Sequence, residues 1–234
     1  MRKPEVIYED LGLISYKKAW DYQKVVQQRI IKEKREADKE PKNRLLLCEH
    51  NPVYTLGKSG KVENLIMNPA QLEANGIEYY KTNRGGDITY HGPGQITGYP
   101  IFDLDQFYND VHRYVRELEQ VVINVLKYFD LNGERVAGFT GVWLQPSSHN
   151  TQSRKICAIG VHMSRWVSMH GFALNVKPDL SHFTGIVPCG IQDSSKTVTS
   201  ISEELNQSID LQKVKLLLKS EFENVFQYEY LIEN

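Results

Sequence analysis

The pattern of apolar and polar residues predicts three long helices. The first has apolar and amide side chains at helical spacing, from a cap at Ser15 to about Lys39. The second has the most continuous apolar stripe and is expected from a cap at Asp105 to about Phe129. The third is amphipathic and covers about Leu211–Phe226. These segments predict helices at both ends of the chain and in its middle.

Short apolar runs bounded by turn residues predict strands between these helices. They cover residues 45–48, 77–82, 99–104, 141–144, 155–163 and 172–176. Strands that alternate with helices, together with a run of strands in the middle, favour an α/β (α+β) fold with a mixed sheet. We expect a single domain over residues 1–234, since this length is ordinary for one.

Composition narrows the possible functions. The net charge of −1 gives no overall field that would attract nucleic acid. No apolar run has the length of a signal peptide or of a transmembrane helix, so we expect a cytoplasmic protein that binds neither membrane nor nucleic acid. Cys48, Cys157 and Cys189 are too widely spaced for a zinc site and too few for a disulfide scaffold.

A glycine-rich stretch, residues 84–95, is the most informative part of the chain. Its glycines allow the backbone to approach a ligand closely, and Arg84, Tyr90 and His91 add polar groups. It has neither the Gly-Lys-Ser/Thr of a phosphate-binding loop nor the spacing of a dinucleotide-binding turn. By itself it fits either a flexible connection or a ligand-binding loop, and its composition favours the ligand.

A cysteine and a lysine are candidate reactive residues, and their sequence settings leave their roles open. Cys189 lies between Pro188 and Gly190, where a thiol can be presented at a loop tip as a nucleophile or can simply fill space. Lys155 opens an apolar strand and is either a partly buried base or a strand-end residue in solvent. On a regular strand Cys157 faces the same side as Lys155, so spacing alone favours Cys157 as its partner. A cysteine between apolar strand residues is, however, more often a buried hydrophobe.

Taken together, these motifs resemble one family, the lipoyl(octanoyl) transferases (lipoate–protein ligase B family). Residues 84–95 resemble its Arg-Gly-Gly…Thr-Tyr-His-Gly-Pro-Gly-Gln signature. Residues 49–57, 155–160 and 170–176 are similar to three further segments, and residues 188–190 fall where the family keeps its catalytic cysteine. The matching segments occur in the same order across about residues 10 to 205.

The resemblance implies a fold, a reaction and a site. The fold would be that of the biotin and lipoate protein ligase catalytic domains. An octanoyl or lipoyl group would pass from acyl carrier protein, through a thioester on Cys189, to a lysine of a lipoyl domain. Acceptors would be the E2 subunits of 2-oxo acid dehydrogenase complexes and the glycine-cleavage H protein, in a step of lipoate biosynthesis and protein lipoylation. Lys155 would be the acid/base partner, and Cys157 would have neither role. Neither ATP nor a metal would be required.

The resemblance also implies which residues bind the acyl chain. They belong to the glycine-rich stretch and to two strands, namely Arg84, Gly85, Gly86, Asp87, Ile88, Thr89, Tyr90, His91, Ala158, Ile159, Gly160, Gly171, Phe172 and Ala173. Small residues among them suit walls beside a slender alkyl chain. The stretch 145–153 is longer than the matching turn of the family, which bears on partner docking more than on chemistry.

Two other functions remain as alternatives. An ATP-dependent lipoate or biotin protein ligase also uses a glycine-rich loop and a strand lysine, but it needs no nucleophilic thiol. A non-catalytic module that binds an acyl group needs neither Lys155 nor Cys189. A papain-like hydrolase would place its cysteine near the N-terminus, which this chain does not.

Overall fold

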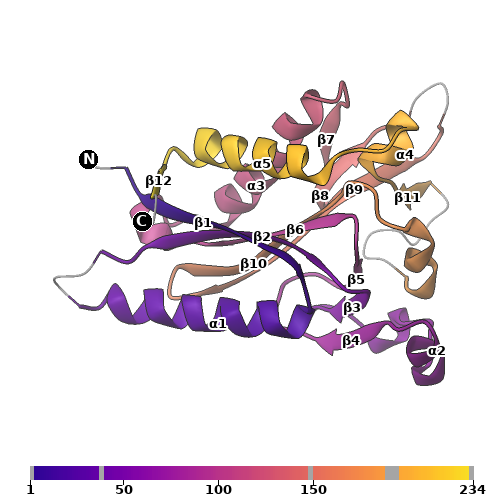
Figure 1. Ribbon diagram of the computed structural model, residues 1–234, viewed down its shortest axis with the longest axis horizontal. Coiled ribbons are helices and arrows are strands. Elements are labelled where there is room, and N and C mark those ends of the chain that lie inside the picture. Colours follow the sequence, from indigo (N-terminus) through magenta and orange to yellow (C-terminus); the bar gives the residue numbers. More distant parts are fainter. Residues whose placement is uncertain (1–2, 37–39, 147–149, 188–194, 232–234) are drawn as a thin grey trace.

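The computed structural model describes residues 3–36, 40–146, 150–187 and 195–231, and they form two sheets with helices packed around them (Figure 1). The larger sheet has the strand order β12-β1-β2-β6-β10-β9-β8-β7, with β11 paired to β9, and the smaller has the order β4-β3-β5. The strands are β1 Glu5–Ile14, β2 Asn43–His50, β3 Val53–Leu56, β4 Glu78–Lys81, β5 Ile88–His91, β6 Gln95–Ile101, β7 Gly133–Val136, β8 Phe139–Leu144, β9 Ser153–Ser164, β10 Val167–Asn175, β11 Lys196–Val198 and β12 Glu229–Leu231.

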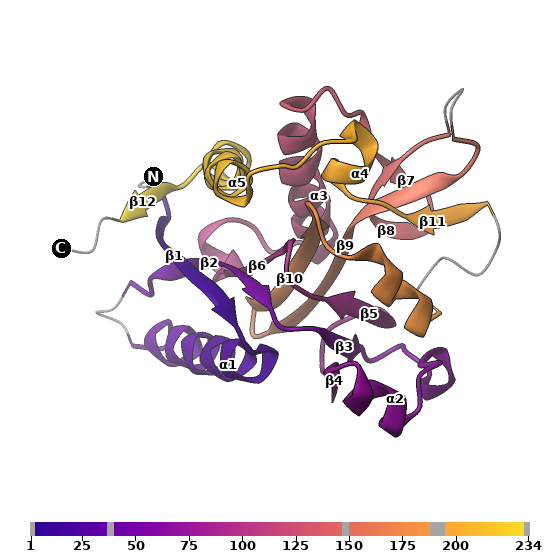
Figure 2. The ribbon, with the colours of Figure 1, turned by 45° about the vertical axis from the view of Figure 1, so that its right-hand side comes forward.

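Helices cover both faces of the large sheet. Helix α1 (Tyr16–Glu33) lies along one face, and α3 (Val111–Lys127) and α5 (Leu211–Phe226) lie on the other (Figures 1 and 2). The main core fills the space between the sheet and these two helices, where Leu118, Phe172 and Phe222 are buried. A second core lies under α1 around Ala19. The mixed sheet between helical layers confirms the predicted fold class.

The small sheet closes one end of the large one (Figure 2). Strand β3 pairs in parallel with β4 and antiparallel with β5. Helix α2 (Pro69–Ala74) and the 3-10 turns η1 (Val62–Asn64) and η3 (Leu180–Gly185) surround it. Its own apolar core includes Tyr54, Tyr90 and Phe183. This unit brings the glycine-rich stretch beside the middle of the large sheet.

The helix predictions are confirmed in position and partly wrong in extent. Helix α5 has the predicted bounds, whereas α1 ends at Glu33, because the mixed-charge residues after it offer no apolar face to the core. Helix α3 begins at Val111, because Asp110 caps it by accepting a hydrogen bond from the Arg113 N–H at 3.0 Å. Asp105 belongs instead to a separate 3-10 turn, η2 (Leu104–Gln106). None of the described helices is both long and apolar enough to cross a membrane.

All six predicted strands are present, and the sequence signals missed several others. Strand β1 was missed because its alternation of apolar and charged residues is irregular, although it pairs in parallel with both β12 and β2. Strand β5 was missed because it lies inside the glycine-rich stretch, whose glycines predict a loop. That strand gives one half of the stretch a fixed backbone. The expectation of a single domain stays a prediction.

Candidate active site

The site forms where strand β9 loses its neighbour β8. Strand β8 pairs with β9 only as far as Val142 opposite Cys157, so the outer edge of β9 beyond Cys157 is left to another segment. The glycine-rich stretch takes this place, since the Gly85 N–H donates to the Val161 carbonyl at 2.9 Å. Gly160 has no Cβ here for a steric reason, because a Cβ would lie 2.6 Å from the Gly85 carbonyl oxygen. The edge of the sheet therefore becomes one wall of a pocket.

Arg84 holds the glycine-rich stretch against strand β3. It is buried, and its Nη2 donates to the Thr55 carbonyl at 2.5 Å and to Thr55 Oγ1 at 2.9 Å. Its Nη1 donates to the Gly85 carbonyl at 3.0 Å. Gly57 directly follows β3, and a Cβ on it would lie 2.3 Å from the Gly86 carbonyl oxygen. Glycine is therefore required where the chain leaves β3 beside the glycine-rich stretch. The guanidinium therefore ties the glycine-rich stretch to β3 through its hydrogen bonds to Gly85 and Thr55.

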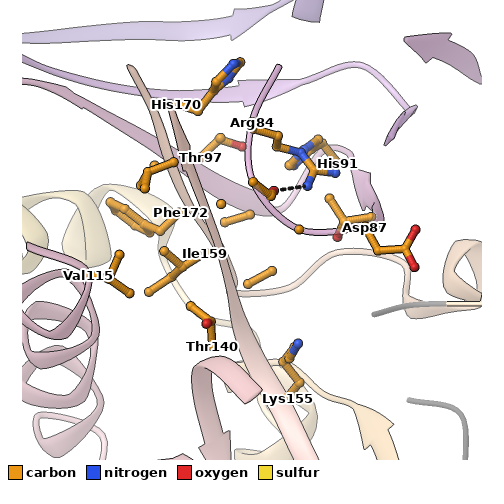
Figure 3. Close-up of a pocket in the computed structure, with 18 of the residues that line it drawn as sticks. Arg84, Asp87, His91, Thr97, Val115, Thr140, Lys155, Ile159, His170 and Phe172 are labelled. Atoms are coloured by element: carbon orange, nitrogen blue, oxygen red, sulfur yellow. Dashed lines mark hydrogen bonds between the residues drawn. The ribbon is translucent and has the colours of Figure 1, made fainter. Parts of the chain in front are cut away.

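These walls enclose a cavity of about 410 Å³, shown in close-up in Figure 3. Such a volume lies in the usual range for small-molecule sites. All of the predicted acyl-binding residues except Tyr90 line it, together with Lys155. They are Arg84, Gly85, Gly86, Asp87, Ile88, Thr89, His91, Ala158, Ile159, Gly160, Gly171, Phe172 and Ala173. Segments distant in sequence are therefore brought to one space.

Tyr90 is the exception, because it is not among the residues that line this cavity. Side chains alternate along a strand, so Tyr90 of β5 points away from the side that Thr89 and His91 occupy. Its ring lies in the core of the small sheet, 4.9 Å from the His182 ring and 5.5 Å from the Phe183 ring. Tyr90 supports the wall from behind and does not line the cavity.

Lys155 stands at one end of the cavity. It lies between β8 and β11, opposite Trp143 and Val198. Its Nζ is 4.7 Å from the centroid of the buried Trp143 ring, which favours one position of the long side chain. In Figure 3 Lys155 and Thr140 lie at one end of the labelled residues, and His170 and Thr97 lie at the other.

Cys157 has a different environment, although it is only two residues away. A β-bulge interrupts the register between β8 and β9, because Trp143 pairs with Lys155 and Val142 pairs with Cys157. The extra residue breaks the alternation of sides that a regular strand would have. Cys157 is fully buried in the main core, and burial raises the pKa of its thiol. The shared face that the spacing suggested is therefore absent, and Cys48 is buried in the same way.

Cys189, the predicted nucleophile, lies outside the described residues, as do Pro188 and Gly190. The structure does place the chain on both sides of this segment. Phe183 before it and Val198 after it both line the cavity.

Three buried histidines beside the cavity, His50, His91 and His170, are held neutral. Burial lowers the pKa of His50 to about 4, and burial together with the charge of Arg84 lowers that of His170 to about 3. The pKa of His91 is also well below its usual value, first because of burial and then because of His50 and Arg84. Such groups are poor proton acceptors at neutral pH. A proton acceptor for chemistry in this cavity must therefore be another side chain.

Several residues that line the cavity were not predicted from the sequence. Val111, His112, Val115 and Arg116 of α3 line it, although their apolar members had been read only as core positions. Tyr16, Thr97 and His170 also line it. His170 has the unusual backbone angle φ of +60°, which no sequence pattern indicates. Nothing in the spacing of α3 residues separates a pocket wall from ordinary packing.

Comparison with known proteins decides the family. Residues 15–223 match the family model described as the lipoyl protein ligase A/B catalytic domain. The chain belongs to this family. It is also 51% identical to an octanoyltransferase of Cytophaga hutchinsonii, over 98% of this chain and 95% of that protein. An octanoyltransferase of Gloeobacter violaceus is 45% identical over 92% of this chain and 87% of its own length. This member of the lipoyl protein ligase A/B family is therefore a transferase, as the resemblance implied.

Solved structures confirm the family fold. A crystal structure of lipoate-protein ligase A bound with ATP superposes with a TM-score of 0.69 at 14% identity, covering 99% of this chain and 88% of that one. A lipoate protein ligase from Thermoplasma acidophilum gives a TM-score of 0.66 at 15% identity, covering all of this chain and 88% of that one. At such low identity these likenesses speak to the fold alone.

Proposed function

We propose that the protein moves an octanoyl group from acyl carrier protein, through a thioester on Cys189, to a lysine of a lipoyl domain. One observation carries this proposal. Lys155 lines the same cavity as the glycine-rich stretch and the small residues of β9 and β10. Octanoyltransferases about half identical to this chain support the octanoyl group as its substrate.

The cavity suits an alkyl chain. Ala173 presents only a small side chain to this cavity, and Ile159 and Phe172 add apolar surface. Burial of an octanoyl chain at about 0.8 kcal/mol per methylene contributes several kcal/mol to binding. This energy holds the reacting carbonyl near one end of the pocket.

The chemistry needs a thiolate and one proton carrier. The Cys189 thiol gives its proton to the Lys155 amine, and its sulfur attacks the carrier thioester. A new carbon–sulfur bond forms, the carrier sulfur leaves, and Lys155 returns the proton to it. The acceptor amine then attacks the acyl-enzyme, and its proton passes through Lys155 to the Cys189 sulfur.

Energetics support a reaction that uses neither ATP nor a metal. The first step exchanges one thioester for another, and the second converts a thioester to an amide, which is downhill. The neutral histidines beside the cavity favour Lys155 as the proton carrier. The E2 lipoyl domains and the glycine-cleavage H protein are the proposed acceptors, in the cytoplasm, where the carrier would meet them.

Transfer in the absence of ATP tests this function. Purified enzyme is mixed with octanoyl-acyl carrier protein and a lipoyl domain, and the mass of the domain is followed. A control domain with its acceptor lysine replaced should gain nothing. We expect octanoylation of the intact domain without ATP. A requirement for ATP would point to the ligase alternative, and binding without transfer would point to the acyl-binding module.

A further inference from the structure

The end of the cavity away from Lys155 is polar, although the proposed substrate chain is not. Tyr16, Thr97 and His170 line this cavity and are each at least 98% buried. Among the described residues, Thr97 Oγ1 and His170 Nδ1 have no hydrogen-bond partner, and Tyr16 OH has none of normal geometry, although a contact with Thr82 acts on this hydroxyl. Buried polar atoms are almost always bonded, so three beside one cavity call for a ligand or a water.

His170 is held with one nitrogen turned to this space. Its backbone N–H donates to Gln23 Oε1 at 3.0 Å, and its Nε2 is 2.8 Å from Asn83 Oδ1. Because Asn83 Oδ1 can only accept, Nε2 carries the proton and Nδ1 is an acceptor. The low pKa of the ring, caused first by burial, keeps it in this neutral form.

The two hydroxyl groups come from elements on either side of His170. Thr97 lies on β6 opposite Ala173 of β10, the strand that carries His170, and both Thr97 and His170 line the cavity. Tyr16 begins α1, and its ring is 6.1 Å from the Trp20 ring, which in turn is 6.0 Å from His170. Burial raises the pKa of Tyr16, so its hydroxyl stays protonated.

Together these groups offer two hydroxyl donors and one nitrogen acceptor. A water molecule matches them, since it accepts two hydrogen bonds and donates to Nδ1. A primary alcohol has the same complement, with one proton to donate and two lone pairs. A methyl group satisfies none of them.

We infer that Tyr16, Thr97 and His170 form a polar subsite that holds an ordered water and ends the acyl pocket, so that longer alkyl chains are rejected and a terminal hydroxyl is accepted. This inference rests on the proposed function. A longer alkyl chain must displace the water and leave the three groups unbonded, and a site built from such groups discriminates strongly against a partner that cannot bond. A chain that ends in a hydroxyl replaces the water without that loss.

The first test compares acyl donors in two variants. Octanoyl-, decanoyl- and 8-hydroxyoctanoyl-acyl carrier protein are supplied to wild type, Thr97→Val and Thr97→Ser. The valine removes the hydroxyl at nearly constant size, and the serine keeps it. We expect Thr97→Val to raise kcat/KM for decanoyl relative to octanoyl about tenfold, and to lower that for 8-hydroxyoctanoyl relative to octanoyl about tenfold. Thr97→Ser should keep both wild-type ratios. Ratios unchanged within twofold in Thr97→Val would overturn the inference.

The second test does not depend on activity. A high-resolution crystal structure of the protein without substrate should show an ordered water within hydrogen-bond distance of Thr97 Oγ1 and His170 Nδ1. Finding the three groups bonded to other protein atoms, with no water among them, would overturn the subsite even in an active enzyme. A water in its place beside an enzyme that transfers no octanoyl group would instead overturn only the proposed function.

Discussion

Lys155 and Cys157 are two residues apart on the same strand and lie in different surroundings. Lys155 reaches a cavity and lies over the Trp143 ring, whereas Cys157 is sealed in the main core. The β-bulge opposite Trp143 separates them, because it breaks the alternation of sides. Chemistry on this strand is therefore confined to its lysine, and its cysteine contributes to packing.

Replacement of Lys155 should give the largest effect on rate. Lys155→Ala removes the proton carrier, and we expect acyl transfer to fall about 10²–10⁴-fold. Lys155→Arg is the matched control for a long basic side chain over Trp143, since its guanidinium cannot lose its proton. Both should lose activity in steady-state assays, and the arginine variant should keep the wild-type Tm. A fully active arginine variant would contradict the role of Lys155 as a base.

Acid should destabilise the protein through the neutral histidines behind the cavity. His50 and His170 have lowered pKa values of about 4 and about 3 in the folded protein. Below about pH 6.5 the unfolded chain therefore binds more protons at these two histidines than the folded chain does. Their stabilisation is present above about pH 6.5 and is lost as the pH falls toward 4. For His50 the loss is on the order of 3 kcal/mol. Urea unfolding of wild type and His50→Gln between pH 7 and pH 4 measures it, and equal pH slopes would contradict this cause.

Replacement of Cys157 should lower stability and leave the rate of acyl transfer nearly unchanged, which is the opposite of the result expected for Lys155. Cys157→Ala leaves a small space in the core, so we expect the free energy of unfolding to fall by about 1–2 kcal/mol. The rate of acyl transfer should stay within about twofold of wild type, because the thiol faces away from the cavity. Urea unfolding and steady-state assays on one preparation check both. A large loss of rate without a loss of stability would place Cys157 in the chemistry.

The edge of β9 offers a finer test of the cavity wall. Gly160→Ala places a Cβ 2.6 Å from the Gly85 carbonyl oxygen, so the glycine-rich stretch must shift. We expect kcat/KM to fall about tenfold, mainly through KM. Gly85→Ala is the milder control, since its Cβ would meet only the Val161 carbonyl, at 3.3 Å. Similar losses in both variants would show that the close approach at Gly160 has no special role.

Much of this arrangement was predictable from the sequence, for physical reasons that differ between its parts. Periodicity predicts α5 and the strands around Lys155 because those residues repeat with a regular period. The resemblance predicts the cavity walls, and glycines mark where the backbone approaches closely. Periodicity could not find the bulge beside Lys155, which depends on pairing with Trp143. It also could not show that Tyr90 turns into the small-sheet core or that His170 adopts a positive φ.

A thioester at Cys189 is the central feature of the proposed reaction, and intact-protein mass spectrometry tests for it most directly. Wild type, Cys189→Ser and Cys157→Ser are each incubated with octanoyl-acyl carrier protein without ATP or acceptor. We expect one octanoyl adduct, removable by hydroxylamine, on wild type and on Cys157→Ser, and no such thioester on Cys189→Ser. A hydroxylamine-labile adduct that persists in Cys189→Ser and disappears in Cys157→Ser would contradict it.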